Sequence, residues 1–128
     1  MRLSTLEPQF LRREERVEQW TRRKEDGTDE EVTGPREYQV YVDTPQEADG
    51  ITFMCPKCFE QNKGSVGTHW VLCWSPKVPP DIDPKPGRWN LVGTNYEDLS
   101  LVAGSSSVLL TSGCEAHFFV QQGNVTFA

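Results

Sequence analysis

Apolar residues near the start of the chain recur at the spacing of an amphipathic helix. The intervals between them are three, four, seven and three positions: Leu3, Leu6, Phe10, Val17 and Trp20. Pro8 suits a first helical turn, and Gly27 is a typical helix terminator. The pattern therefore predicts a charged helix, interrupted on its apolar face by Arg13 and followed by an acidic linker over residues 26–34.

The rest of the chain alternates apolar and polar residues, which predicts β-strands. Seven short segments carry this pattern: 38–43, 51–54, 66–75, 89–92, 107–111, 118–121 and 125–127. Gly123-Asn124 is a tight hairpin signal, residues 44–50 suggest a short helical turn, and the five prolines within residues 75–88 require an extended loop. We therefore expect a mainly β fold, a small antiparallel sheet or half-barrel preceded by the N-terminal helix.

Composition divides the chain near residue 36. Residues 1–36 are 47% charged and residues 37–128 are 16% charged, which predicts a helix-and-linker segment (1–36) and a β domain (37–128). Three interpretations of the first segment remain open: a helix packed on its own domain, a helix for docking or self-association, or a disordered arm. The second would make the segment a contact for a protein partner or for a homo-oligomer.

Charge and hydropathy exclude several classes of protein. The net charge is −6 and the sequence pI is about 4.9, so binding driven by nucleic-acid phosphates is not expected. The sequence has no run of 18 apolar residues that would span a membrane and no secretory signal pattern. We expect a protein of a reducing cytoplasm, where cysteines are metal ligands or core thiols before they are disulfides.

Two short motifs predict a metal site. Cys55-Pro-Lys-Cys58 is a C-x2-C pair and Cys114-Glu-Ala-His117 is a C-x2-H pair, and either spacing lets two side chains on a tight turn reach one ion. Sulfur and imidazole ligands favour Zn²⁺ over Mg²⁺ or Ca²⁺. The expected zinc ligands are Cys55, Cys58, Cys114 and His117.

His69 and Cys73 are two further candidate ligands. On one strand they would share a face but lie about 13 Å apart, so they cannot both bind one tetrahedral ion. Cys73 stands between apolar residues and is expected to be a core thiol, and His69 is expected to be a hydrogen-bonded residue near the sheet. Neither is expected to bind the metal.

The C-terminal 75 or so residues resemble a bacterial and bacteriophage family of small zinc-binding proteins catalogued as a domain of unknown function. Some members carry the label ammonia monooxygenase. The segments that carry the resemblance are MCPKC (54–58), HWVLCW (69–74), PGRWN (86–90), SSSVLL (105–110), GCEAHFFV (113–120) and QGNVTF (122–127). The resemblance implies zinc held by the four expected ligands and a phage-borne origin.

The leading functional hypothesis is a non-enzymatic, zinc-stabilised domain, encoded by a phage or prophage, that binds another protein. Four protein ligands leave no open position on the metal, and the exposed aromatic candidates for binding are Trp70, Trp74 and Trp89. The expected location is the bacterial host cytoplasm or the virion, as a virion component or a host-interaction factor.

Two alternatives come from different functional classes. A zinc hydrolase would need an open metal position and a nearby carboxylate as base, for which Glu115 and Glu60 are the closest in sequence. A zinc-knuckle nucleic-acid binder would use Lys57 and Lys63, against the acidity of the whole domain.

Overall fold

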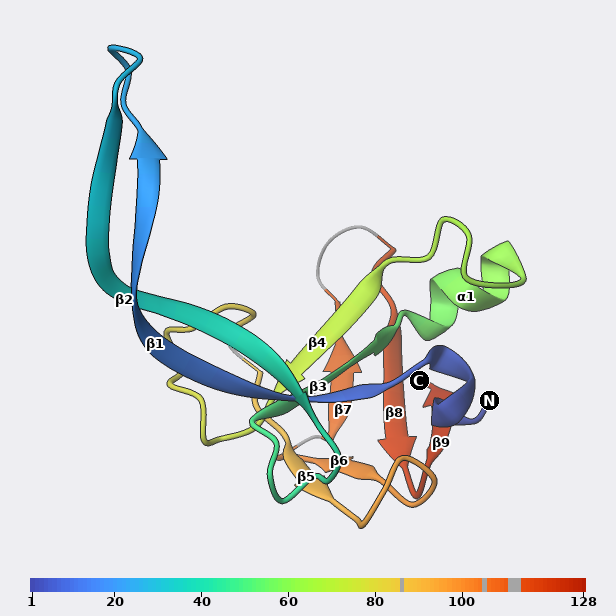
Figure 1. Cartoon of the computed structure of the whole chain (residues 1–128). Coiled ribbons are helices and arrows are strands. Elements are labelled where there is room, and N and C mark those ends of the chain that lie inside the picture. The colour runs from blue at the N-terminus through green and yellow to red at the C-terminus, as the bar shows by residue number, and fades with distance from the viewer. Residues whose placement is uncertain (86, 105, 111–113) are drawn as a thin grey trace.

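The computed structural model describes residues 1–85, 87–104, 106–110 and 114–128. Pro86, Ser105 and Gly113, which belong to the motifs above, lie outside this part. The elements follow one another along the chain as a short 3₁₀ helix, nine strands and one α-helix (Figure 1): η1 (Leu3–Leu6), β1 (Gln9–Arg23), β2 (Asp29–Val42), β3 (Gly50–Met54), α1 (Pro56–Asn62), β4 (Trp70–Trp74), β5 (Asn90–Val92), β6 (Ser100–Val102), β7 (Ser107–Leu109), β8 (His117–Gln121) and β9 (Asn124–Phe127).

The strands form three antiparallel sheets in the described part of the chain. The largest has the order β2-β1-β3-β4, the smallest pairs β5 with β6, and the third has the order β7-β8-β9. The prediction of a mainly β, antiparallel fold is confirmed. The α-helix lies between β3 and β4, where Pro56 occupies its first turn, and not at the N-terminus.

The predicted N-terminal helix is wrong: residues 9–42 form a long β-hairpin. Its register pairs Phe10 with Val42 at the base and Arg23 with Asp29 at the tip. Gly27 (φ +85°) lies in the turn and terminates no helix, and the Asp26 carboxylate accepts hydrogen bonds from the backbone and hydroxyl of Thr28. The expected acidic linker is thus the turn and the first part of β2, and residue 36 lies inside that strand.

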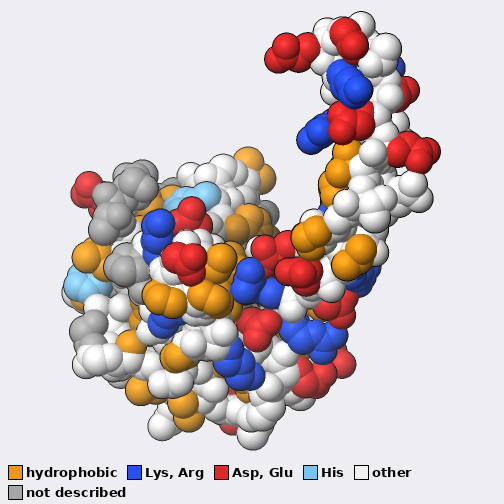
Figure 2. Space-filling model, turned by 90° about the vertical axis from the view of Figure 1, so that its left-hand side faces the viewer, with side chains coloured by type: hydrophobic (Ala, Val, Ile, Leu, Met, Phe, Trp, Pro, Cys, Tyr) orange, Lys and Arg blue, Asp and Glu red, His pale blue; other side chains and the backbone are white. Residues whose placement is uncertain are grey.

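Beyond its base, the hairpin leaves the body as a two-stranded arm, residues 13–39 (Figures 1 and 2). Trp20 and Val32 lie opposite each other on one face of the arm, and Tyr38 is on the same face. Two guanidinium groups cover these rings, Arg36 at 4.9 Å from the Trp20 centroid and Arg16 at 4.7 Å from that of Tyr38. Cross-strand ion pairs such as Arg22–Glu30 (3.2 Å) support the ribbon further out.

The first eleven residues contribute several side chains to the core of the body. Leu3, Leu6 and Phe10 are completely buried, in one cluster with residues of the C-terminal sheet such as Phe118. The Leu3 amide donates to the carbonyl oxygen of Gly123 (2.8 Å), which ties the N-terminus to the last hairpin. The hydrophobic stripe therefore serves two structures, because its first members enter the core and its last members lie on the arm.

The predicted strands after residue 37 occur, with shifted ends. The strand expected over 66–75 is shorter, since β4 begins at Trp70, and β6 was not predicted. The last hairpin turns at Gln122-Gly123, both at positive φ, one residue before the predicted Gly123-Asn124. The proline-rich segment is a loop, as expected, but its described residues are not extended: the Val78 amide donates to the Ser75 carbonyl oxygen and the Ile82 amide to that of Pro79, which makes two turns. The Arg88 guanidinium holds this loop by donating to five of its carbonyl oxygens.

Candidate metal centre

Three cysteines and one histidine converge where the two larger sheets meet. The ligand atoms of Cys55, Cys58, His69 and Cys114 all lie within 4.8 Å of one another. Cys55 directly follows β3 and caps α1, and Cys58 lies in the first turn of that helix. His69 directly precedes β4, and Cys114 lies between β7 and β8. Such a set of side chains could hold a metal ion such as zinc.

The distances fit a tetrahedral ion. The Sγ atoms of Cys55 and Cys114 are 3.5 Å apart, and His69 Nε2 is 3.2 Å from Cys114 Sγ. Tetrahedral zinc with Zn–S near 2.3 Å and Zn–N near 2.0 Å places its ligand atoms about 3.5–3.8 Å from one another. These two distances are thus within a few tenths of an ångström of those that the ion would impose, and the remaining pairs lie within 4.8 Å.

Backbone contacts hold the ligands in place. The Cys55 amide donates to the His69 carbonyl oxygen (2.8 Å), which continues the β3–β4 ladder by one residue and brings these two ligands opposite each other. The Cys55 carbonyl oxygen accepts from the Phe59 amide in the first turn of α1. Lys57 Nζ donates to the Cys114 carbonyl oxygen (2.6 Å), linking the helix to the segment that carries the third cysteine.

The thiols differ in acidity because their surroundings differ. Burial raises the pKa of Cys55 to about 12, and burial also raises that of Cys58. At Cys114 burial acts in the same direction, but hydrogen bonds from His69 and the Ala116 amide outweigh it and lower the pKa to about 7. Without a cation this site therefore favours one thiolate and keeps the other two thiols protonated, whereas a divalent cation would favour all three thiolates.

The structure differs from the predicted ligand set at one position. Cys55, Cys58 and Cys114 come together as expected, but the histidine among them is His69 and not His117. His117 begins β8 opposite Leu109 and is exposed, with its ring centroid 6.2 Å from that of Phe119.

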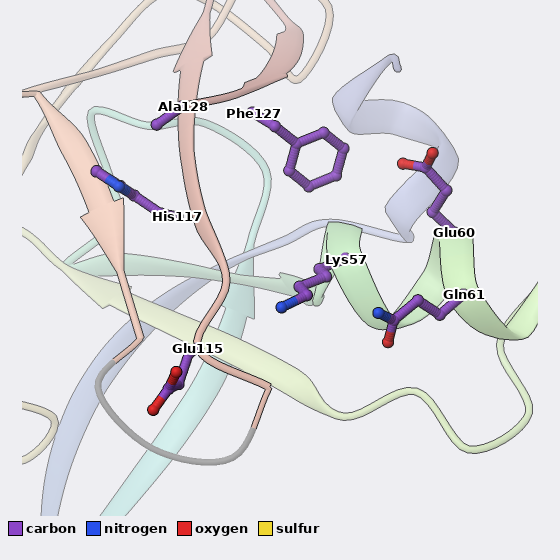
Figure 3. Close-up of a pocket in the computed structure, with 7 residues that line it drawn as sticks. All are labelled: Lys57, Glu60, Gln61, Glu115, His117, Phe127 and Ala128. Atoms are coloured by element: carbon purple, nitrogen blue, oxygen red, sulfur yellow. The ribbon is translucent and has the colours of Figure 1, made fainter.

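His117 instead lines an open pocket of about 610 Å³ beside α1 (Figure 3). Its lining also includes Glu60 and Glu115, the two candidates for the base of a zinc hydrolase. Figure 3 shows the side chains spread around this pocket without a common point of convergence. In the described part of the chain, no residue of the metal cluster lines it.

Cys73 is a core thiol, as expected. It is 1% exposed and belongs to the hydrophobic core cluster, and burial raises its pKa to about 12. Of the three tryptophans expected as binding residues, Trp74 is buried, Trp89 is partly buried and Trp70 is half exposed.

A sequence signal for His69 existed in the pairing of its strand. With β3 and β4 as antiparallel neighbours, the residue after β3 (Cys55) must oppose the residue before β4 (His69). The predicted strand over 66–75 placed His69 in the interior of the strand, so the pairing of His69 with Cys55 could not be recognised from that prediction.

Comparison of the chain with family models, curated proteins and solved structures yields no match. No helix among the described residues combines the length and the apolar character needed to cross a membrane. The cluster of three cysteines and one histidine suggests a small zinc-binding protein.

Proposed function

We propose that this chain is a non-enzymatic protein-interaction domain, in which one structural zinc holds the body together and the projecting arm contacts a partner protein. The observation that carries this proposal is the arm itself. It extends two long strands away from the core (Figure 2) and carries Trp20, Val32 and Tyr38 together on one face.

A structural role for the metal follows from its ligands. Zn²⁺ bound by Cys55, Cys58, His69 and Cys114 has a closed coordination sphere, and three thiolates give the site a formal charge of −1. Such an ion has little capacity to acidify a water molecule. It would instead tie β3, α1 and β4 to the segment that enters β8, across 59 residues of sequence between Cys55 and Cys114.

The arm has the composition of a binding surface. A two-stranded ribbon is at best marginally stable in water, so burial against a partner would stabilise it. Trp, Tyr and Arg dominate the residues that carry binding energy at protein interfaces. The arm presents Trp20 and Tyr38 beneath Arg36 and Arg16.

A protein partner fits the charge of the molecule better than a nucleic acid does. The net charge is −6, and the arginines of the arm are interspersed with glutamates, among them the ion pairs Arg16–Glu14 and Arg22–Glu30. The positive charges of the arm are therefore largely compensated, which disfavours binding to phosphates.

The motif resemblance supports a phage or prophage origin as part of this proposal. Its most specific segments, CPKC and GCEAHFF, supply three of the four clustered residues. The proposed setting is the host cytoplasm or the virion.

A zinc hydrolase is the second candidate, favoured by one observation: Glu60, Glu115 and His117 line the same pocket. In that reading a carboxylate would act as base toward a metal-bound water. The pocket does not include the four clustered residues, so the interaction domain is the better-supported proposal.

The test joins metal analysis to site-specific cross-linking. X-ray absorption of the purified full chain is expected to show three sulfurs and one nitrogen around zinc, whereas a bound water would favour the hydrolase. A photo-reactive amino acid replaces Trp20, on the aromatic face, or Gln19, on the opposite face, in producing cells. We expect one discrete protein adduct from position 20 and none from position 19. Equal adducts from both positions, or none from either, would contradict binding through the arm.

A further inference from the structure

Two strands of the body end their sheets with an unpaired edge. Among the described residues, β4 pairs only with β3, and β7 pairs only with β8. The backbone groups of His69 and Ser75 form hydrogen bonds on the β3 side, so the odd-numbered residues between them direct their backbone N–H and C=O toward β3. The backbone N–H and C=O of Leu72, an even-numbered residue, therefore point to the outer edge. On β7 the Leu110 amide donates toward β8, which places the backbone N–H and C=O of Leu109 on the outer edge. Within the described residues these four groups have no hydrogen-bond partner.

The two open edges face each other and are joined at both ends. At one end, the Trp89 amide donates to the Trp74 carbonyl oxygen (3.0 Å) and its indole Nε1 donates to that of Ser107 (3.2 Å). At the other end, His69 and Cys114 meet in the metal cluster. A strand that pairs with both edges needs about 10 Å between β4 and β7, twice the usual spacing of strands. Trp89 is bonded to one edge through its backbone amide and to the other through its indole, and it spans a gap of that order.

The gap is an apolar groove of about 420 Å³ in the described structure. Side chains and backbone of both edge strands line it together with the bridging tryptophan: Val71, Leu72, Val108, Leu109, Leu110 and Trp89. An apolar lining with unsatisfied backbone groups on two sides fits one type of ligand, an extended polypeptide.

We propose that this groove binds an extended segment of a partner protein as an added β-strand between β4 and β7. The segment hydrogen-bonds to the backbone of Leu72 and Leu109, and an apolar side chain of the segment packs on Trp89. This inference rests on the proposed interaction function but uses a surface separate from the arm. It would make the sheet continuous from β2 through β4 and the partner strand to β7, β8 and β9.

A positive charge at the rim of the groove favours a negatively charged end on the bound segment. Lys85 is exposed on the proline-rich loop beside the groove and forms no ion pair or hydrogen bond with the described residues. The neighbouring Arg88 is already bound to backbone carbonyl oxygens of that loop. A free cation at this rim favours a carboxylate at the end of the bound segment.

The probe is a synthetic six-residue peptide of alternating valine and threonine that ends in glutamate, acetylated at its N-terminus and amidated at its C-terminus so that the glutamate side chain is its one carboxylate. It is titrated into the zinc-loaded full chain and followed by amide signals in NMR. We expect the amides of Leu72 and Leu109 to shift and to become protected from hydrogen exchange. The same peptide with alternate backbone nitrogens methylated lacks the donors and is expected to bind at least tenfold more weakly. Equal binding of both peptides would overturn strand addition.

Proline on the edge supplies the protein variant. Leu109→Pro removes a backbone N–H that points outward and donates to no described residue, so the change costs no internal hydrogen bond. Proline is tolerated at such a position of an edge strand. We expect about tenfold weaker peptide binding from Leu109→Pro, while the matched Leu109→Thr, which keeps the amide, stays within about threefold. Lys85→Glu should weaken the glutamate peptide but not its glutamine counterpart. Unchanged binding by Leu109→Pro, with zinc content and circular dichroism preserved, would refute the proposal.

Two controls separate this inference from other outcomes. Trp20→Thr on the arm should leave peptide binding intact, so a loss of arm cross-linking and a loss of groove binding are distinguishable. If the full chain is a dimer in sedimentation and Leu109→Pro makes it a monomer, the occupant is a second copy and the assignment to a different partner is wrong.

Discussion

The N-terminal segment offers the sharpest test of how this fold is held together. The side chains of Leu3 and Leu6 are completely buried in the same core cluster as Phe53 and Phe118. Truncating one buried leucine to alanine costs about 2–5 kcal/mol. The double change Leu3→Ala/Leu6→Ala is therefore expected to cost roughly 4–10 kcal/mol, comparable to the whole stability of a small domain, about 5–15 kcal/mol.

Urea unfolding of the zinc-loaded chain, followed by tryptophan fluorescence, measures this cost. The control is Val17→Ala on the arm, because Val17 is 76% exposed and its change should stay within about 0.5 kcal/mol. If the free energy of unfolding of the double variant is within about 1 kcal/mol of that of the parent, Leu3 and Leu6 are not part of the core. In that case residues 37–128 would be expected to fold as a domain without the N-terminal segment.

Three further outcomes are expected. His69→Ala should weaken zinc binding by more than the roughly 10–100-fold that loss of an outer hydrogen bond costs, and His117→Ala should leave it unchanged in a competition titration with a chelator. Replacing residues 16–36 by Asn-Gly, which joins Glu15 to Glu37 at their cross-strand position, should keep the fold and its zinc content by circular dichroism and metal analysis. Burial raises the pKa of Cys73 to about 12 in the folded protein. The contribution of this thiol to the free energy of unfolding is therefore complete below about pH 9 and is lost, at about 1.4 kcal/mol per pH unit, as the pH rises toward 12. In urea unfolding, Cys73→Val should flatten this decline at alkaline pH.

The mistaken helix shows where a sequence pattern is ambiguous. Intervals of three, four and seven positions match a helix, yet Phe10, Trp20 and two arginines between them, Arg12 and Arg16, also fall on alternate positions of one strand face. What decided the structure is the partner strand, since Trp20 faces Val32 and Arg22 faces Glu30. Such pairing depends on residues a dozen or more positions apart, which a single-segment periodicity does not contain.

The metal site was more accessible to sequence reasoning because ligand spacing is local. The C-x2-C pair follows from one turn at the start of α1, and Cys114 is close enough in space to complete a trio. The histidine was not accessible in the same way. His117 is near Cys114 in sequence but begins a strand with an exposed side chain, whereas His69 reaches the site through the β3–β4 register.

The position of the cluster connects stability with binding. Cys55 and His69 belong to the ends of β3 and β4, while Cys114 precedes β8, so a bound ion would fasten the two larger sheets to each other at one end of the groove. Trp89 fastens the other end through two hydrogen bonds and through packing against the core. Each of these bonds is worth only about 0.5–1.5 kcal/mol, whereas structural zinc in small peptides is worth roughly 10–16 kcal/mol, so a bound ion would be the stronger of the two fastenings. We therefore expect chelation to release the edges of β4 and β7 first and to weaken peptide binding in the groove.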